Sequence, residues 1–178
     1  MWYFDGNYND AVGSYHGYST PGLPSFYTGY FGQAIFFNAT ARQALYAPFI
    51  PLNNVSFTVE AWIMPTAYSG QSDYSLIGLC PIQVTNKCLH INIRNLKLYF
   101  GFYFNDITGT STIQLNKWIH VAFVFDVTNY QQSIYLDGIL ERQAIQSSAL
   151  RAESGNVTFG TNEGVATPNN FFEVTLKH

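Results

Sequence analysis

Apolar and polar residues alternate along two stretches of this chain. From Phe57 to Ile63 every second residue is apolar, and the same holds from Ile119 to Phe125. Strict alternation indicates a β-strand with one buried face. In residues 118–126 the opposite face is also mostly apolar, so we expect this strand to lie centrally in its sheet.

Shorter apolar runs extend the pattern to about ten strands. The Asp137-Gly138 pair separates two of them and is typical of a two-residue type I′ hairpin. Only residues 147–152 suggest a helical turn. Further strands are predicted at residues 33–37, 74–79, 89–93, 97–104, 133–136, 139–142, 157–160 and 172–176. Short strands joined by polar turns predict an all-β fold, a two-sheet antiparallel β-sandwich.

The composition agrees with this fold and excludes some partners. Aromatic residues make up 17% of the 178 residues, which favours strands. The net charge of −3, with no basic cluster, argues against nucleic acid. No apolar run approaches the roughly 18 residues of a membrane span, which argues against membrane insertion. Because the start lacks a signal-peptide pattern, we expect residues 1–178 to form one domain excised from a larger extracellular protein.

Cys80 and Cys88 flank a short loop between two predicted strands. Adjacent strands would bring them within disulfide reach, and such a bond would stabilise the fold by about 2–3 kcal/mol. Two unpaired thiols are the alternative. A metal site is less favoured, because His90 is the only other candidate ligand nearby and would leave a zinc shell incomplete.

Three acceptor sequons begin at Asn38, Asn54 and Asn156. Together with the close cysteine pair they favour an extracellular or cell-surface glycoprotein.

An ordered set of short motifs resembles the laminin-G-like, concanavalin A-like jelly-roll domains of extracellular multidomain proteins. The motifs are Phe-Asp-Gly at 4–6 with Asp10, Gly-Tyr-Phe-Gly-Gln-Ala at 29–34, and the stretches 57–63, 118–122 and 135–138. The resemblance covers about residues 4–160 and implies binding of glycans or proteins, often assisted by calcium. Residues 169–176 lack the Gly-x-Ile-Asp strand that usually closes such domains. Any calcium ligand carried by that aspartate is therefore in doubt.

A structural calcium site is predicted on Asp5, Asp10 and Asn38, and no organic cofactor is expected. Calcium prefers oxygen ligands, and the fold could bring these residues together near the N-terminal strand. The alternative is that Asp5 and Asp10 only form turns with their neighbours.

Ligand contacts are expected in the loops at the rim of the sandwich. Tyrosine rings there would stack on sugars, and polar groups would bind hydroxyls. The alternative is that the polar residues only face water in their loops and that the tyrosines pack within the protein. Trp62 and Trp118 are expected in the interior. The predicted ligand-binding residues are Asp73, Tyr74, Asn86, Tyr103, Asn105, Asp106, Asn162 and Glu163.

The sequence favours a non-catalytic protein. Glycosidases on this fold need closely spaced carboxylates, whereas Glu60 stands alone on its strand. Glu60 and His120 are expected to form a buried pair between the sheets rather than a catalytic dyad. Lectin-like recognition of glycans is the leading function, and a protein-interaction or adhesion spacer domain of a surface protein is the alternative. A degenerate hydrolase is the third hypothesis.

Overall fold

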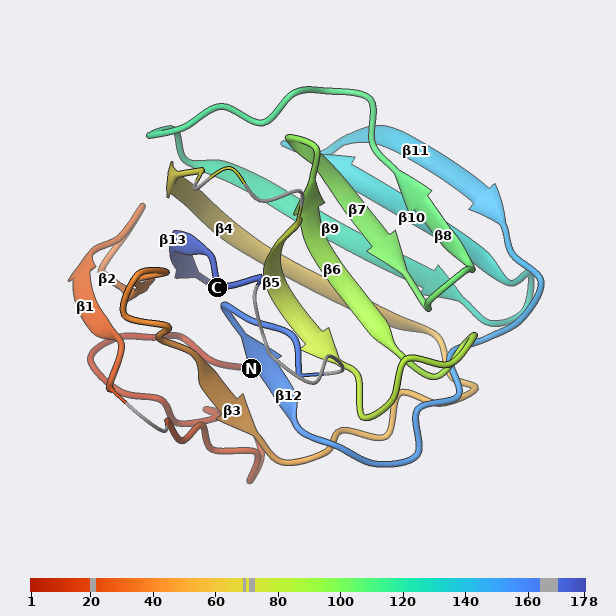
Figure 1. Cartoon of the computed structure of the whole chain (residues 1–178), viewed down its shortest axis with the longest axis horizontal. Helices are drawn as coiled ribbons and strands as arrows, with labels where there is room; N and C mark the ends of the chain where they lie inside the picture. Colours follow the sequence, from red (N-terminus) through yellow and green to blue (C-terminus); the bar gives the residue numbers. More distant parts are fainter. Residues whose placement is uncertain (20–21, 69, 71–72, 164–169) are drawn as a thin grey trace.

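The computed structural model describes residues 1–19, 22–68, 70, 73–163 and 170–178. These residues form two antiparallel sheets and no helix, and the sheets lie over one another (Figure 1). The seven-stranded sheet has the order β1 (Ser25–Thr28), β2 (Gln33–Phe37), β13 (Glu173–Lys177), β4 (Phe57–Ala67), β9 (Ile119–Asp126), β10 (Gln131–Leu136) and β11 (Ile139–Ile145). The six-stranded sheet has the order β3 (Leu45–Ala47), β12 (Val157–Phe159), β5 (Asp73–Leu79), β6 (Leu89–Arg94), β7 (Lys97–Gly101) and β8 (Asp106–Thr108). The predicted two-sheet antiparallel sandwich is confirmed.

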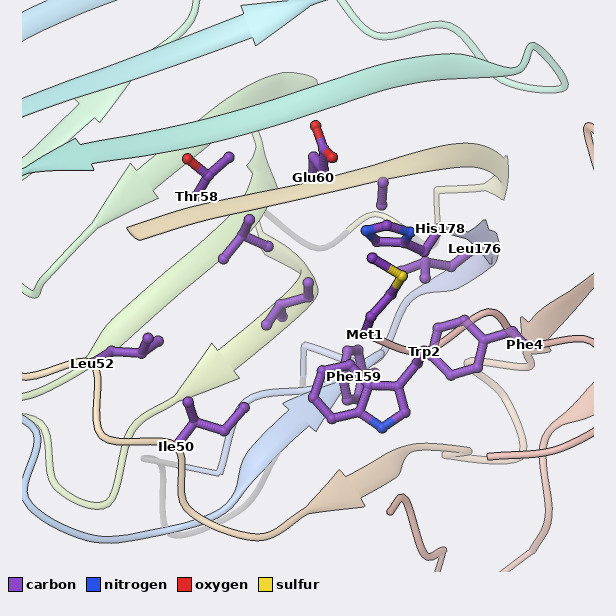
Figure 2. A pocket seen from close by; sticks show the side chains of 13 residues that line it. Met1, Trp2, Phe4, Ile50, Leu52, Thr58, Glu60, Phe159, Leu176 and His178 are labelled. Carbon is purple, nitrogen blue, oxygen red and sulfur yellow. The ribbon is translucent and has the colours of Figure 1, made fainter. Parts of the chain in front are cut away.

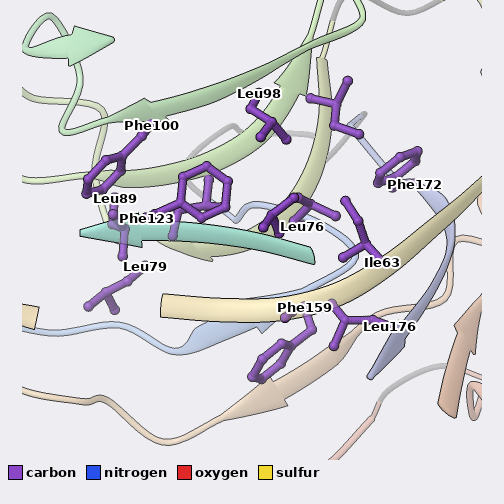
Figure 3. Close-up of a cluster of buried hydrophobic side chains, with 14 of the residues drawn as sticks. Ile63, Leu76, Leu79, Leu89, Leu98, Phe100, Phe123, Phe159, Phe172 and Leu176 are labelled. Atoms are coloured by element: carbon purple, nitrogen blue, oxygen red, sulfur yellow. The ribbon is translucent and has the colours of Figure 1, made fainter. Parts of the chain in front are cut away.

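The alternation along β4 and β9 decides which side chains enter the core. Ile63 and Phe123 are buried between the sheets in one cluster with Leu98 and Phe100 of the other sheet, and the rings of Phe123 and Phe100 meet edge-on (Figure 3). Each such side chain contributes roughly 1.5–3 kcal/mol through the apolar surface that it buries. As predicted, β9 is a central strand, since it pairs with β4 on one side and β10 on the other.

Two connections match their sequence signals. Asp137 and Gly138 have φ values of 49° and 78°, as a type I′ hairpin between β10 and β11 requires. A disulfide joins Cys80, just after β5, to Cys88, just before β6, and closes the loop between these paired strands.

Residues 147–152 differ from the prediction, because they form bends and irregular backbone instead of a helical turn. Their polar groups bond to other loops. The Ser147 N–H donates to Asn105 Oδ1, the Ser148 carbonyl accepts from Asn105 Nδ2, and the Arg151 N–H donates to the Asn86 carbonyl. These long-range bonds replace the local ones that a helical turn would make.

Candidate functional site

The turn between β1 and β2 folds over the outer face of the seven-stranded sheet and is held there by a buried ammonium group. Lys177 is only 1% exposed, and its Nζ donates to Asp5 Oδ1 at 2.6 Å. The same oxygen accepts the Gln33 N–H at 2.8 Å, and the ring of Phe31 lies 5.2 Å from the ammonium. The hydrogen bond from Lys177, followed by that from Gln33, lowers the pKa of the Asp5 carboxyl group.

This turn carries Tyr30 onto two tryptophans, and the three rings form what we call the aromatic platform. The Tyr30 ring stacks on Trp62 with centroids 3.9 Å apart and planes 10° apart. Trp118 meets Tyr30 edge-on at 6.3 Å. Tyr30 is 54% exposed, and both tryptophans are half-buried. The expectation that Trp62 and Trp118 lie in the interior is therefore wrong.

The register of the strands explains why Trp62 faces outward. It lies between Ala61 and Ile63, which both face the core, and so takes the opposite side of β4. Its partners across the sheet are Lys177 on β13 and His120 on β9. All three side chains share the outer face because paired residues in an antiparallel sheet point the same way.

Polar groups border the aromatic platform on its β9 side. His120 lies beside Trp62 with ring centroids 5.3 Å apart, and its Nε2 is 3.8 Å from Glu60 Oε2. Asp137 Oδ1 accepts the His120 backbone N–H at 2.8 Å. A shallow depression is lined by the platform together with His120 and Asp137. Glu60 and His120 thus meet, but on the outer face of one sheet and partly exposed, instead of buried between two sheets as expected.

The predicted rim residues fall into separate groups, of which Asp73 and Asp106 form one. Both lie on the outer face of the six-stranded sheet, beside Arg94 and Tyr99. The Arg94 guanidinium pairs with both carboxylate oxygens of Asp73 and lies 3.7 Å from the centroid of the Tyr99 ring. Burial and the hydrogen bond with Asp106 raise the pKa of the Tyr99 hydroxyl. Asp73 is therefore engaged by Arg94, whereas Asp106 Oδ1 is buried without a hydrogen-bond partner.

Asn86, Tyr103 and Asn105 fasten loops together. Asn105 is 4% exposed, and its Nδ2 donates to Asn86 Oδ1 at 2.8 Å and to the Ser148 carbonyl at 2.9 Å. The Asn86 N–H donates to the Tyr103 carbonyl at 3.3 Å. The arrangement gives these amides a structural role.

The three remaining predicted ligand residues are engaged elsewhere. Tyr74 is 2% exposed and packs on Tyr68 and Phe172, so its predicted ligand role is corrected to core packing. Asn162 is buried, with its Nδ2 donating to the Leu89 carbonyl at 3.4 Å, and Glu163 accepts from Asn156 Nδ2 at 3.5 Å. The eight predicted residues do not form one site.

The residues proposed for calcium do not fit the ion in this arrangement. The Asp5 carboxylate faces the Lys177 ammonium, and Asp10 Oδ1 accepts from the Met1 ammonium at 2.7 Å. Burial alone would raise the pKa of Asp10. The hydrogen bonds from that ammonium and from backbone N–H groups have a larger, opposite effect, so the pKa is lowered overall. Asn38 Oδ1 accepts the Ala41 N–H at 2.8 Å. The Asp5 carboxylate already neutralises the Lys177 ammonium group, so the arrangement does not support the predicted calcium site, which stays untested.

An apolar cavity of about 380 Å³ opens beside β4 (Figure 2). Trp2 packs edge-on against Phe159 at its base, with Ile50 and Leu52 along one side. Thr58 and Glu60 point away from it. The cavity offers few polar groups for a hydroxylated ligand, which makes it less suited to sugars than the aromatic platform.

The sequons lie in loops. Asn54 is exposed, whereas Asn38 and Asn156 are half-buried, so Asn54 is the most accessible acceptor. Glycosylation stays a prediction. No helix long and apolar enough to cross a membrane occurs in the part of the chain that the structure describes.

Comparison with known proteins agrees with the fold. Domain 4 of AbnA, an extracellular arabinanase from Geobacillus stearothermophilus solved with arabinotriose, matches with a TM-score of 0.72 and 18% identity, over 99% of this chain and 90% of that one. The binding domain of Paraclostridial Mosquitocidal Protein 1 matches with a TM-score of 0.69 and 15% identity, over 92% of this chain and 43% of that one. Mouse laminin α1 domains LG4-5 match with a TM-score of 0.65 and 12% identity, over 89% and 43% respectively.

At these identities the solved structures show the fold alone. No curated protein sequence matches the chain. The family model of the concanavalin A-like lectin/glucanases superfamily, of the laminin G type, matches residues 38–177. This match covers most of the chain and includes Trp62, Trp118 and the β9–β10–β11 hairpins. The chain therefore belongs to the concanavalin A-like lectin/glucanases superfamily.

Proposed function

We propose that this protein is a non-catalytic, extracellular binding module that holds a glycan on the aromatic platform. The observation that carries the proposal is the exposed stack of Tyr30 on Trp62, with Trp118 beside it and polar groups along one edge. Aromatic faces offer an apolar surface to the C–H groups of a sugar ring, and their polar ends reach its hydroxyls.

The polar edge supplies the hydrogen bonds that orient such a ligand. Glu60 and Asp137 carry acceptor carboxylates, and the His120 ring can donate or accept. Glu60 is paired with His120 instead of a second carboxylate, which supports binding over hydrolysis.

The platform is organised before any ligand arrives. The Asp5–Lys177 ion pair and the Asp5–Gln33 hydrogen bond fix the turn that carries Tyr30. A rigid site loses less conformational freedom on binding, which favours affinity. The arabinanase domain solved with arabinotriose is a relative in fold, and its bound sugar makes arabinotriose a reasonable first probe.

The experiment is a glycan array followed by titration calorimetry with arabinotriose and the best array ligands. Replacing Tyr30 by alanine should weaken binding about tenfold, equivalent to about 1.4 kcal/mol. Tyr130→Ala is the matched control, because Tyr130 is 44% exposed but lies in the β9–β10 turn. Equal affinity of wild type and Tyr30→Ala would refute the platform, and a flat array would refute glycan binding.

One observation favours a protein partner as the second candidate. Strand β11 is an edge of the seven-stranded sheet, and Ile139, Leu140 and Ile145 on it are 71%, 48% and 72% exposed. An exposed apolar edge can pair with a strand of another protein. A flat glycan array, with a pull-down partner that is lost on Ile145→Lys, would support this adhesion role instead.

A further inference from the structure

Three side chains with metal-binding atoms converge at the junction of β5 and β6. The sulfur atoms of Cys80 and Cys88 and a ring nitrogen of His90 all lie within 4.8 Å of one another. Cys88 Sγ is 2.7 Å from His90 Nε2. Cys88 and His90 are two residues apart along the strand direction, so their side chains project from the same side.

The setting of this cluster is buried but lies under an exposed loop. Cys80, Cys88 and His90 are 3%, 0% and 9% exposed, whereas residues 81–85 between the cysteines are exposed. Opening that loop would let a reductant and a metal ion reach the sulfur atoms.

The disulfide and a metal cannot share these sulfur atoms as they stand, because a metal binds thiolates. A dithiol reductant transfers two electrons and two protons to the Cys80–Cys88 bond and becomes a cyclic disulfide itself. The S–S bond breaks, and two thiols remain. Binding of a divalent ion then displaces both thiol protons to solvent.

We propose that the reduced protein binds one zinc ion through Cys80, Cys88 and His90, so that the disulfide and the zinc site are alternative states of one junction. Two thiolates and a neutral imidazole balance the charge of Zn²⁺, which limits the electrostatic cost of burial. Three protein ligands with one open position are a known zinc shell, and an incomplete set of four does not exclude the ion.

Cobalt is the spectroscopic probe for this site. Reduced, oxygen-free protein should bind one equivalent of Co²⁺ with a thiolate-to-metal charge-transfer absorption, and Zn²⁺ should displace it. The oxidised protein should bind none. Replacing His90 by alanine should weaken binding about tenfold or more, whereas His16→Ala, which removes an exposed histidine of the N-terminal segment outside the junction, should leave binding unchanged.

A melting experiment separates a folded site from free thiols in an unfolded chain. Zn²⁺ should raise the melting temperature of the reduced protein, because an ion bound only by the folded state stabilises it. The double variant Cys80→Ser/Cys88→Ser should bind no cobalt and show no shift. Absence of cobalt binding by the reduced protein would overturn the proposal. So would binding that His90→Ala leaves intact, or zinc that does not change the melting temperature.

Discussion

Tyr30 lies face to face with Trp62, with ring centroids 3.9 Å apart and planes inclined by 10°. This contact joins the β1–β2 turn to β4, across β2 and β13 of the same sheet. One face of the Tyr30 ring is covered by Trp62, yet Tyr30 stays 54% exposed, so its other face is accessible. The stack therefore serves both to seat the turn and to present a flat apolar surface.

The Asp5–Lys177 pair should respond unequally to removal of its two members. Asp5→Ala leaves a buried ammonium group without its partner and should lower the free energy of unfolding by about 1–3 kcal/mol. Lys177→Met keeps the buried aliphatic stem and leaves a carboxylate that is half exposed to water, so its cost should be smaller. Urea unfolding of both variants measures the difference. Equal costs, or a larger cost for Lys177→Met, would contradict this account.

Glu141 should make stability depend on pH. Its carboxylate accepts the backbone N–H and the hydroxyl of both Thr110 and Ser111, at 2.8 Å each. Burial raises the pKa of Glu141, but these hydrogen bonds lower it more, from 4.5 to about 2.

A carboxyl group whose pKa is lower in the folded protein than in the unfolded chain stabilises the fold at pH values above its unfolded-state pKa. This stabilisation is lost as the pH falls through the folded-state pKa. The difference in unfolding free energy between wild type and Glu141→Gln should thus be full above about pH 4.5 and shrink towards pH 2. Unfolding curves across this range measure it. A difference that does not change with pH would show that the carboxylate charge is not involved.

Removal of the disulfide should destabilise the oxidised protein by about 2–3 kcal/mol, because the open loop gains conformational freedom in the unfolded chain. The double variant Cys80→Ala/Cys88→Ala, unfolded in guanidinium without reductant, tests this value. A variant as stable as the wild type would mean that the native pairing of β5 and β6 already fixes the loop.

Calcium should not change the melting temperature through Asp5. Its carboxylate pairs with the buried Lys177 ammonium group, and an ion would have to displace it. Melting curves with calcium and with chelator test this expectation, since a ligand bound by the folded state raises the melting temperature. A rise of several degrees that Asp5→Asn abolishes would restore the calcium site.

The sequence predicts the sandwich well because strand alternation is a local signal. The same alternation places Trp62 opposite Ala61 and Ile63, on the outer face. The expectation of buried tryptophans is wrong because Trp62 takes the outer side of this alternation, where Tyr30 covers it instead of the core. The partner of Trp62 is harder to foresee, since Tyr30 reaches it only through the folding back of the β1–β2 turn and the remote Asp5–Lys177 pair.

The predicted ligand residues at the rim have partners that are equally hard to foresee. Asp73, Asn105 and Asn162 are polar residues at strand ends or in loops, which is also where binding residues occur. Their partners Arg94, Asn86 and Leu89 satisfy them within the fold. Residue type alone does not distinguish a polar side chain that hydrogen-bonds two loops together from one that binds a ligand.

The indole N–H signals of Trp2, Trp62 and Trp118 offer the most direct measurement of the central claim. The chain has these three tryptophans, and Trp2 lies outside the platform, with its Nε1 donating to the Tyr15 carbonyl. In a ¹⁵N–¹H NMR titration with a glycan that binds, the signals of Trp62 and Trp118 should shift together while that of Trp2 stays fixed. Saturating glycan that leaves Trp62 and Trp118 unmoved, or that shifts Trp2 alone, would contradict a glycan site on the aromatic platform.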